Sequence, residues 1–266
     1  AGALPDASAV LSVPELSALG ALFRSSRATQ LTEQETEYVV TCVKHVFPEH
    51  LVLQLTVTNT LEEQELRDVR VVVEPAEAEA WAVETVLPAA KAAFQDPATV
   101  WVALRRNPEA GFPSTSLACE LKFRVMEVDG GDVVEGDGFE EDYALEPVEV
   151  TPADFMAPAP QADPKACWER LGEEGEVTEK FALNFSSVQA AIDAVLSCLG
   201  MTALLGSATA SGQDVHRLVM SGTFIGGLDV MARAQLKKAT DTSVVLMIKI
   251  RSPNQDLSQL MADCLG

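Results

Sequence analysis

The chain has 266 residues, 47% of them hydrophobic, and a formal net charge of −21 at pH 7. This length can bury the core of one large domain or of two ordinary ones, and the hydrophobic content argues against disorder. The negative charge argues against nucleic acid as a partner and against direct binding to an anionic membrane, because both need a basic footprint.

The cysteines argue against a metal site. All five are widely separated and no CxxC pair occurs, the positions being Cys42, Cys119, Cys167, Cys198 and Cys264. Zinc sites place cysteine and histidine ligands at short, fixed spacings. We therefore expect no metal, no cofactor and a reduced, cytosolic compartment.

The first 29 residues predict a hinge or linker remnant. Apolar residues recur between Val10 and Phe23, but Pro14 limits any helix that they could form. A tether is the expected structure for this segment.

Residues 30–153 read as a series of strands separated by clusters of Pro, Gly and Asp. The clearest is Leu51–Thr58, in which leucine and valine alternate with other residues. Seven such runs at spacings near a dozen residues predict an immunoglobulin-like β-sandwich. The expected strands are Glu37–Val46, Leu51–Thr58, Leu66–Val73, Ala82–Leu87, Thr99–Arg105, Ser114–Val128 and Tyr143–Val150.

An acidic run lies within this domain. Residues 127–149 contain ten Asp and Glu residues and no Lys or Arg. The spacing of Asp129, Asp132, Glu135 and Asp137 does not match that of an EF-hand calcium loop. The run predicts a solvated hairpin loop.

A second domain is expected from residue 154 to residue 266, after a linker with Pro152, Pro158 and Pro160. A helix capped by Asp163 and a helix over Ser186–Leu199, ended by Gly200, alternate with strand patterns. Ser252 is the expected cap of a last helix. The expected strands are Thr178–Leu183, Val215–Phe224, Asp229–Lys238 and Ser243–Arg251.

Alternation gives the sheet of this second domain two different faces. One face is apolar, with Val230, Leu236 and Ile248, and it offers a surface that the amphipathic helices can cover. The other face carries Arg233, Lys237, Lys249 and Arg251. The sequence therefore predicts an α/β platform in which an antiparallel sheet is covered by helices on one side.

Signals for catalysis are weak. His45, His50 and His216 lie near no nucleophile motif, and Gly226-Gly227 falls between two strands, where a hairpin turn is expected. We expect no enzymatic activity.

Trp168 is the candidate binding residue. Such a residue is either packed inward or left open as the floor of a peptide pocket, and Trp and Arg are enriched at binding hot spots. Guanidinium groups pair with carboxylates, so an indole rimmed by arginines suits short acidic-aromatic segments. In the alternative interpretation, the cations only solvate a sheet face.

Several long stretches together resemble the appendage (ear) domain of the coatomer gamma subunit family, gamma-COP. They are QLTEQETEYVVTCVKHVF, TNTLEEQELRDVRVVVEP, GFEEDYALEPVEVTPADF, ACWERLGEE and FIGGLDVMARAQL, and the match runs from about Gln30 to Gly266. The resemblance implies an immunoglobulin-like sandwich followed by a platform.

The resemblance also implies a function. The family is a non-catalytic part of the COPI vesicle coat, which moves cargo between Golgi and endoplasmic reticulum. It implies an Arf GTPase-activating protein and other coatomer subunits as partners, a cytoplasmic location at Golgi membranes, and membrane contact only through the coat. The platform tryptophan falls on Trp168 and the basic residues of its pocket on Arg233 and Arg251. The alternative is a purely structural role, in which the platform packs against other coat subunits.

Overall fold

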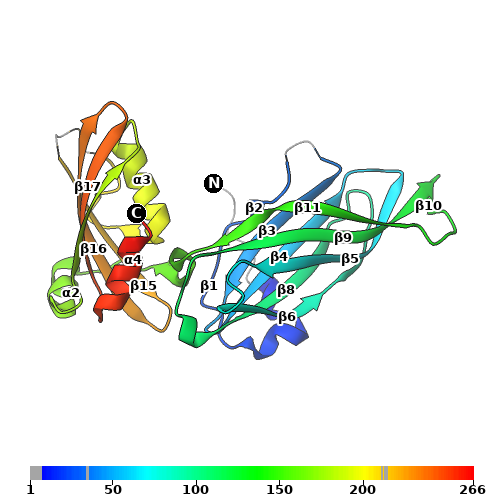
Figure 1. Ribbon diagram of the computed structural model, residues 1–266, viewed down its shortest axis with the longest axis horizontal. Helices are drawn as coiled ribbons and strands as arrows, with labels where there is room; N and C mark the ends of the chain where they lie inside the picture. Colours follow the sequence, from blue (N-terminus) through cyan, green and yellow to red (C-terminus); the bar gives the residue numbers. More distant parts are fainter. Residues whose placement is uncertain (1–7, 34–35, 211, 213–214) are drawn as a thin grey trace. The chain divides into compact units, whose positions relative to one another are not determined.

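The chain folds into two compact units, Ala1–Val150 and Thr151–Gly266 (Figure 1). The computed structural model describes residues 8–33, 36–210, 212 and 215–266. The part of the expected hinge that covers residues 1–7 lies outside the described residues. Among the described residues the strands pair almost entirely antiparallel, which confirms the expectation of a mainly antiparallel β protein with helices.

The first sheet of the first unit has the order β1-β3-β4-β8-β6, and β2 pairs with β3. Leu51, Leu53 and Leu55 on β4 have no exposed surface, because alternation turns them all to the same buried face. The strands are β1 (Arg24–Ser25), β2 (Thr29–Gln30), β3 (Tyr38–Val46), β4 (His50–Asn59), β6 (Trp81–Leu87) and β8 (Ala98–Arg106).

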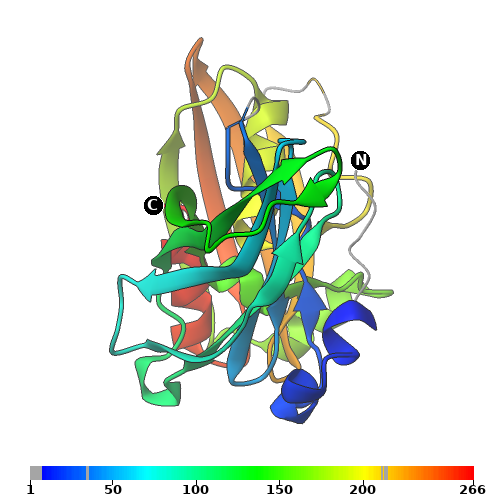
Figure 2. The ribbon, with the colours of Figure 1, turned by 90° about the vertical axis from the view of Figure 1, so that its right-hand side faces the viewer.

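The segment expected to be a hinge is folded where the structure describes it. A short helix α1 (Ser8–Leu11) and a 3₁₀ helix (Pro14–Leu19) pack on the first sheet, and they are drawn in blue in Figure 1 and Figure 2. Val10 is 0% exposed and Leu16 is 3% exposed, in one cluster with Val52 and Trp101. The structure differs from the prediction because the second face of this sheet is also apolar and needs a cover.

The second sheet of the first unit has the order β10-β9-β5-β7, and β11 pairs with β9. The expected acidic loop is mostly strand: most of its acidic side chains remain in solvent while its backbone pairs with β9. Strand β7 was not predicted, because Ala-Ala-Lys-Ala has little β propensity. The strands are β5 (Gln64–Pro75), β7 (Ala89–Ala92), β9 (Thr115–Asp129), β10 (Asp132–Val133) and β11 (Phe139–Val150).

The second unit is built on one sheet of order β12-β15-β16-β17-β13, and β14 pairs with β15. Helices α3 (Val188–Leu199) and α4 (Gln255–Asp263) cover its apolar face, where Ala232 and Ile248 are 0% exposed (Figure 1). Helix α2 (Pro164–Leu171) lies on the other face, against Met231. The strands are β12 (Met156–Pro158), β13 (Val177–Leu183), β14 (Thr202–Ala203), β15 (His216–Phe224), β16 (Leu228–Thr240) and β17 (Ser243–Arg251).

Local signals explain most boundaries in the second unit. Gly200 ends α3 with φ 65°, and Gly226 and Gly227 turn the β15–β16 hairpin with φ 86° and 79°, values that glycine adopts without strain. The expected cap of α4 was wrong: Asn254 Oδ1 accepts from the Leu257 amide at 2.8 Å. The Ser252 hydroxyl is not free for this role, because it is buried against Ser258.

A buried histidine makes the first unit sensitive to pH. His45 is 0% exposed, Gln54 Oε1 accepts from its Nε2 at 3.0 Å, and the Ser25 hydroxyl donates to its Nδ1 at 2.7 Å. Burial lowers the pKa of His45, which keeps the folded ring neutral.

In the unfolded state the pKa of His45 is near 6.5. Below this pH the unfolded state binds a proton at His45, whereas the folded state does not. We therefore expect the stability of the first unit to fall from pH about 6.5 downward, with His45 adding a slope of at most about 1.4 kcal/mol per pH unit. Urea unfolding at several pH values, monitored by hydrogen exchange of the first-unit amides, measures this slope. A His45→Gln variant with the same slope as the parent would contradict it.

Candidate functional site

Helix α2 is fixed on the sheet by its own sequence. The Asp163 carboxylate accepts from the Ala166 amide at 2.9 Å and Pro164 takes the first helical position, which suits a residue without an N–H group. Cys167 and Trp168, 5% and 7% exposed, then pack on Met231. This helix places Trp168 over strands β16 and β17.

A salt bridge holds the end of α2 on β16. Arg170 Nη2 donates to Asp229 Oδ2 at 2.7 Å, and this hydrogen bond raises the pKa of Arg170. The Arg170 side chain is 60% exposed, so solvent screens the attraction between the two charges. Its role is to fix the helix in register with the sheet.

The two predicted arginines lie against the indole ring of Trp168 and help to bury it. The guanidinium carbon of Arg233 lies 4.2 Å from the centre of the indole ring, and that of Arg251 lies 4.4 Å from it. The sequence thus predicted the three neighbours, but the expected open floor is not what the structure shows, since the indole is 7% exposed. Cation–π contacts of this kind stabilise by roughly 0.5–2 kcal/mol each.

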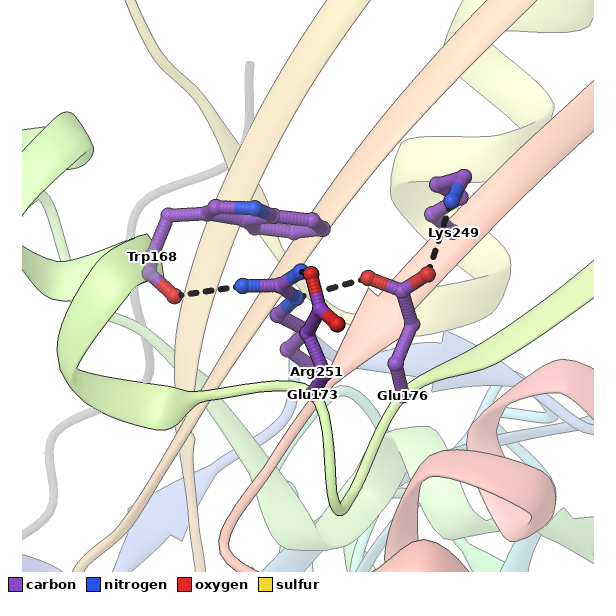
Figure 3. A network of polar contacts seen from close by, with 5 residues as sticks. All are labelled: Trp168, Glu173, Glu176, Lys249 and Arg251. Carbon is purple, nitrogen blue, oxygen red and sulfur yellow. Dashed lines mark hydrogen bonds and ion pairs between the residues drawn. The ribbon is translucent and has the colours of Figure 1, made fainter.

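Arg251 belongs to the interior of the cluster. Figure 3 shows its guanidinium beneath the indole, with Glu176 beside it. Nε donates to Glu176 Oε2 at 2.7 Å, and Nη1 donates to the Trp168 carbonyl at 3.0 Å. Lys249 donates to the other Glu176 oxygen at 2.7 Å, and this bond, with that of Arg251, lowers the pKa of Glu176. At 8% exposure, Arg251 offers little to a ligand.

Of the three predicted site residues, Trp168, Arg233 and Arg251, Arg233 is the one that faces solvent. It lies one strand from Arg251, opposite Lys249 in the β16–β17 register, and its residue surface is exposed. Partial burial against the indole lowers the pKa of Arg233, and the charge of Arg251 adds to this effect. Arg233 forms no ion pair with the described residues, so its charge is available to a partner.

A shallow groove beside Arg233 extends the site along the sheet. Its volume is about 250 Å³, and we call it the sheet groove; its lining is Arg217, Leu218, Val219, Arg233, Ala234, Gln235, Met247 and Lys249. Met247 is 44% exposed. Sequence reasoning missed Arg217 and Met247 as site residues, although strand alternation places Met247 on the same face as Lys249.

The chemistry of the sheet groove is that of recognition. Exposed guanidinium and ammonium groups next to a thioether and a valine suit a ligand with carboxylates and an apolar side chain. Among the described residues no cluster of His, Cys, Asp and Glu could hold a metal ion. Within the same residues, none of the helices combines the length and hydropathy that crossing a bilayer demands.

Two family models together match nearly the whole chain. The coatomer gamma subunit appendage platform subdomain matches residues 5–151. The coatomer subunit gamma-1 C-terminal appendage platform matches residues 153–265.

Individual relatives give the same result. The chain is 35% identical to coatomer subunit gamma-2 of Danio rerio over 259 residues, which are 96% of this chain and 29% of that protein. It is 34% identical to coatomer subunit gamma of Dictyostelium discoideum over 244 residues, or 89% of this chain and 27% of the relative. The chain thus spans under a third of the length of these relatives. A crystal structure of the yeast GGA1 GAE domain is 9% identical with a TM-score of 0.30, covering 47% of this chain and 98% of that one.

Proposed function

Because the chain belongs to the coatomer gamma subunit appendage family, we propose that it is a non-catalytic protein-interaction module of the COPI vesicle coat. It recruits an Arf GTPase-activating protein and other coat factors, including coatomer subunits, during transport between Golgi and endoplasmic reticulum. It acts in the cytoplasm at Golgi membranes, and reaches the membrane through the coat.

In this proposal the two parts of the chain have separate roles. Residues 30–153 are an immunoglobulin-like sandwich subdomain and residues 154–266 are the platform subdomain. Recruitment takes place on the platform, at the face of its sheet that α3 and α4 leave open.

The observation that carries the proposal is the sheet groove. A chain of net charge −21 keeps three cations, Arg217, Arg233 and Lys249, around an apolar lining on one exposed face. Neither Arg217 nor Arg233 forms an ion pair with the described residues. An acidic-aromatic peptide would supply both the missing carboxylates and an apolar group for Met247.

The predicted site residues take different roles in this proposal. Arg233 contacts the ligand directly. Trp168 and Arg251 are positioning residues: the indole holds Arg233 over the groove, and the buried guanidinium of Arg251 holds the indole. A surface built this way is already formed before binding, which lowers the entropy cost of a weak, exchangeable contact.

Arg233→Gln tests the proposal. We expect it to weaken binding of a short peptide of aspartates around one phenylalanine roughly tenfold, because one charge-assisted contact is lost. It should also reduce capture of the purified GTPase-activating protein, while circular dichroism stays unchanged. Calorimetry measures the peptide affinity. Trp168→Ser should reduce capture at least as much, but it also opens a cavity, so Arg233→Gln is the cleaner variant.

Lys238→Gln is the matched control, since Lys238 is an exposed cation of the same strand that pairs with Asp241. Equal loss in this control would show that only net charge matters. Capture of coat subunits without saturable peptide binding would instead support the alternative, a purely structural coat domain.

A further inference from the structure

Half of the cations of the first unit gather on the outer face of its second sheet. The unit contains ten Lys and Arg residues. Five of them lie on three neighbouring strands, β7, β5 and β9, and we call this set the cationic face: Arg67, Arg70, Lys91, Lys122 and Arg124. This concentration of positive charge is unexpected, because the same unit contains the acidic run.

The strand register places like charges opposite each other. Arg67 pairs with Arg124 and Arg70 pairs with Lys122 across β5 and β9, and Lys91 of β7 lies opposite Arg67. Like charges at directly opposed positions destabilise a sheet. The folded unit therefore bears a cost that its own packing does not explain.

Neighbouring carboxylates offset only part of this repulsion. Glu65 pairs with Arg67 at 2.9 Å and with Lys91 at 3.5 Å. Glu120 pairs with Lys122 at 2.7 Å, and Glu140 pairs with Arg124 at 3.6 Å. The bond to Glu120 raises the pKa of Lys122, and the charge of Arg70 works against it. Arg70 itself forms no ion pair with the described residues.

A hollow of about 630 Å³ lies over the same face. Arg70, Lys122 and Arg124 are in its middle. On the β7 side it is bounded by Pro88, Ala89 and Ala90, and on the β11 side by Glu140, Glu141 and Asp142, with Asp68 and Phe123 completing the lining. The surface is thus ordered across the strands as small apolar, cationic and acidic.

We propose that this cationic face docks a segment of another protein chain that carries acidic side chains followed by basic ones. The acidic side chains lie over Arg70 and Lys122, and the basic ones meet the carboxylates of β11. A polyphosphate or a strongly anionic headgroup fits less well, because Glu140 and Asp142, opposite Arg124 and Lys122 in the register, repel a ligand that is negative throughout. This proposal does not depend on the sheet groove of the second unit.

Arg70→Gln gives the test two readouts with opposite signs. Neutralising Arg70 removes the like-charge contact with Lys122, so we expect the melting temperature of the first unit to rise by about 1–2 °C. The same variant should weaken, roughly fivefold, the binding of a blocked peptide with a run of glutamates followed by lysines. A merely structural cation would lower the melting temperature when removed.

Binding is followed by nuclear magnetic resonance, with shifts expected at the β5 and β9 amides in the intact chain. A peptide of the same composition with glutamate and lysine alternating should bind more weakly, as should inorganic tripolyphosphate. Arg105→Gln is the matched control, because Arg105 is an exposed cation of the same unit on β8. Equal loss in this control, a lower melting temperature for Arg70→Gln, or preference for tripolyphosphate would overturn the proposal.

Discussion

Replacing Arg251 by methionine is expected to destabilise the second unit by about 3 kcal/mol, because removing one partner of a buried ion pair leaves the other groups uncompensated. Arg251 is 8% exposed; its guanidinium donates to Glu176 and to the Trp168 carbonyl, and it lies against the indole face. Methionine keeps the apolar contact with the ring but none of the hydrogen bonds. Hydrogen exchange of the β16 and β17 amides measures the opening free energy of this unit by itself.

Lys237→Met is the control for this prediction. Lys237 lies on the same face of β16, exposed and without an ion pair to the described residues, so its loss should change the opening free energy by less than about 0.5 kcal/mol. Equal effects of the two substitutions would mean that the cluster around Trp168 does not stabilise the unit.

Replacing Gly175 by alanine is expected to cost about 3 kcal/mol through overpacking. A Cβ atom at this position would clash with the backbone oxygen of Ser252 and would lie 3.3 Å from the backbone carbon of Asn254. Neither backbone group can rotate away. The shift would also move the adjoining Glu176 away from Arg251 and Lys249, so we expect weaker peptide binding at the sheet groove as well.

Gly136→Ala separates this contact from the general effect of removing a glycine. A Cβ atom at Gly136 would meet nothing within 4 Å, and the backbone there is not in the left-handed region. We expect a change within about 0.5 kcal/mol of zero. Denaturant unfolding of both variants provides the comparison, and a stable Gly175→Ala variant with unaltered ligand binding would contradict the packing described here.

From the sequence we could predict which residues of the candidate site lie near one another, but not how exposed each of them is. Strand alternation placed Arg233 and Arg251 on one face, and the Asp163 cap marked the helix that carries Trp168. Whether the indole stays open depends on which side chains reach over it, and this follows from tertiary packing. The burial of Trp168 against two guanidinium groups has no periodic signal in the chain.

The fold shows the same division between local and distant causes. Alternation of apolar and other residues predicted the long strands, and glycines marked the end of α3 and the β15–β16 turn. The position of the segment around Val10 and Leu16 could not be predicted. The segment packs on the outer face of a sheet whose residues lie far along the chain. The cationic face escaped detection for the same reason, since the opposition of Arg70 and Lys122 is a matter of register.

The most direct test of the proposed function is a magnetic resonance titration of the intact chain with the peptide of aspartates around one phenylalanine. We expect saturable shifts at amides of β15, β16 and β17 around Arg233 and Met247, and we expect salt and Arg233→Gln to weaken the binding. Absence of saturable shifts on this face, or equal binding by the Arg233→Gln variant, would contradict it.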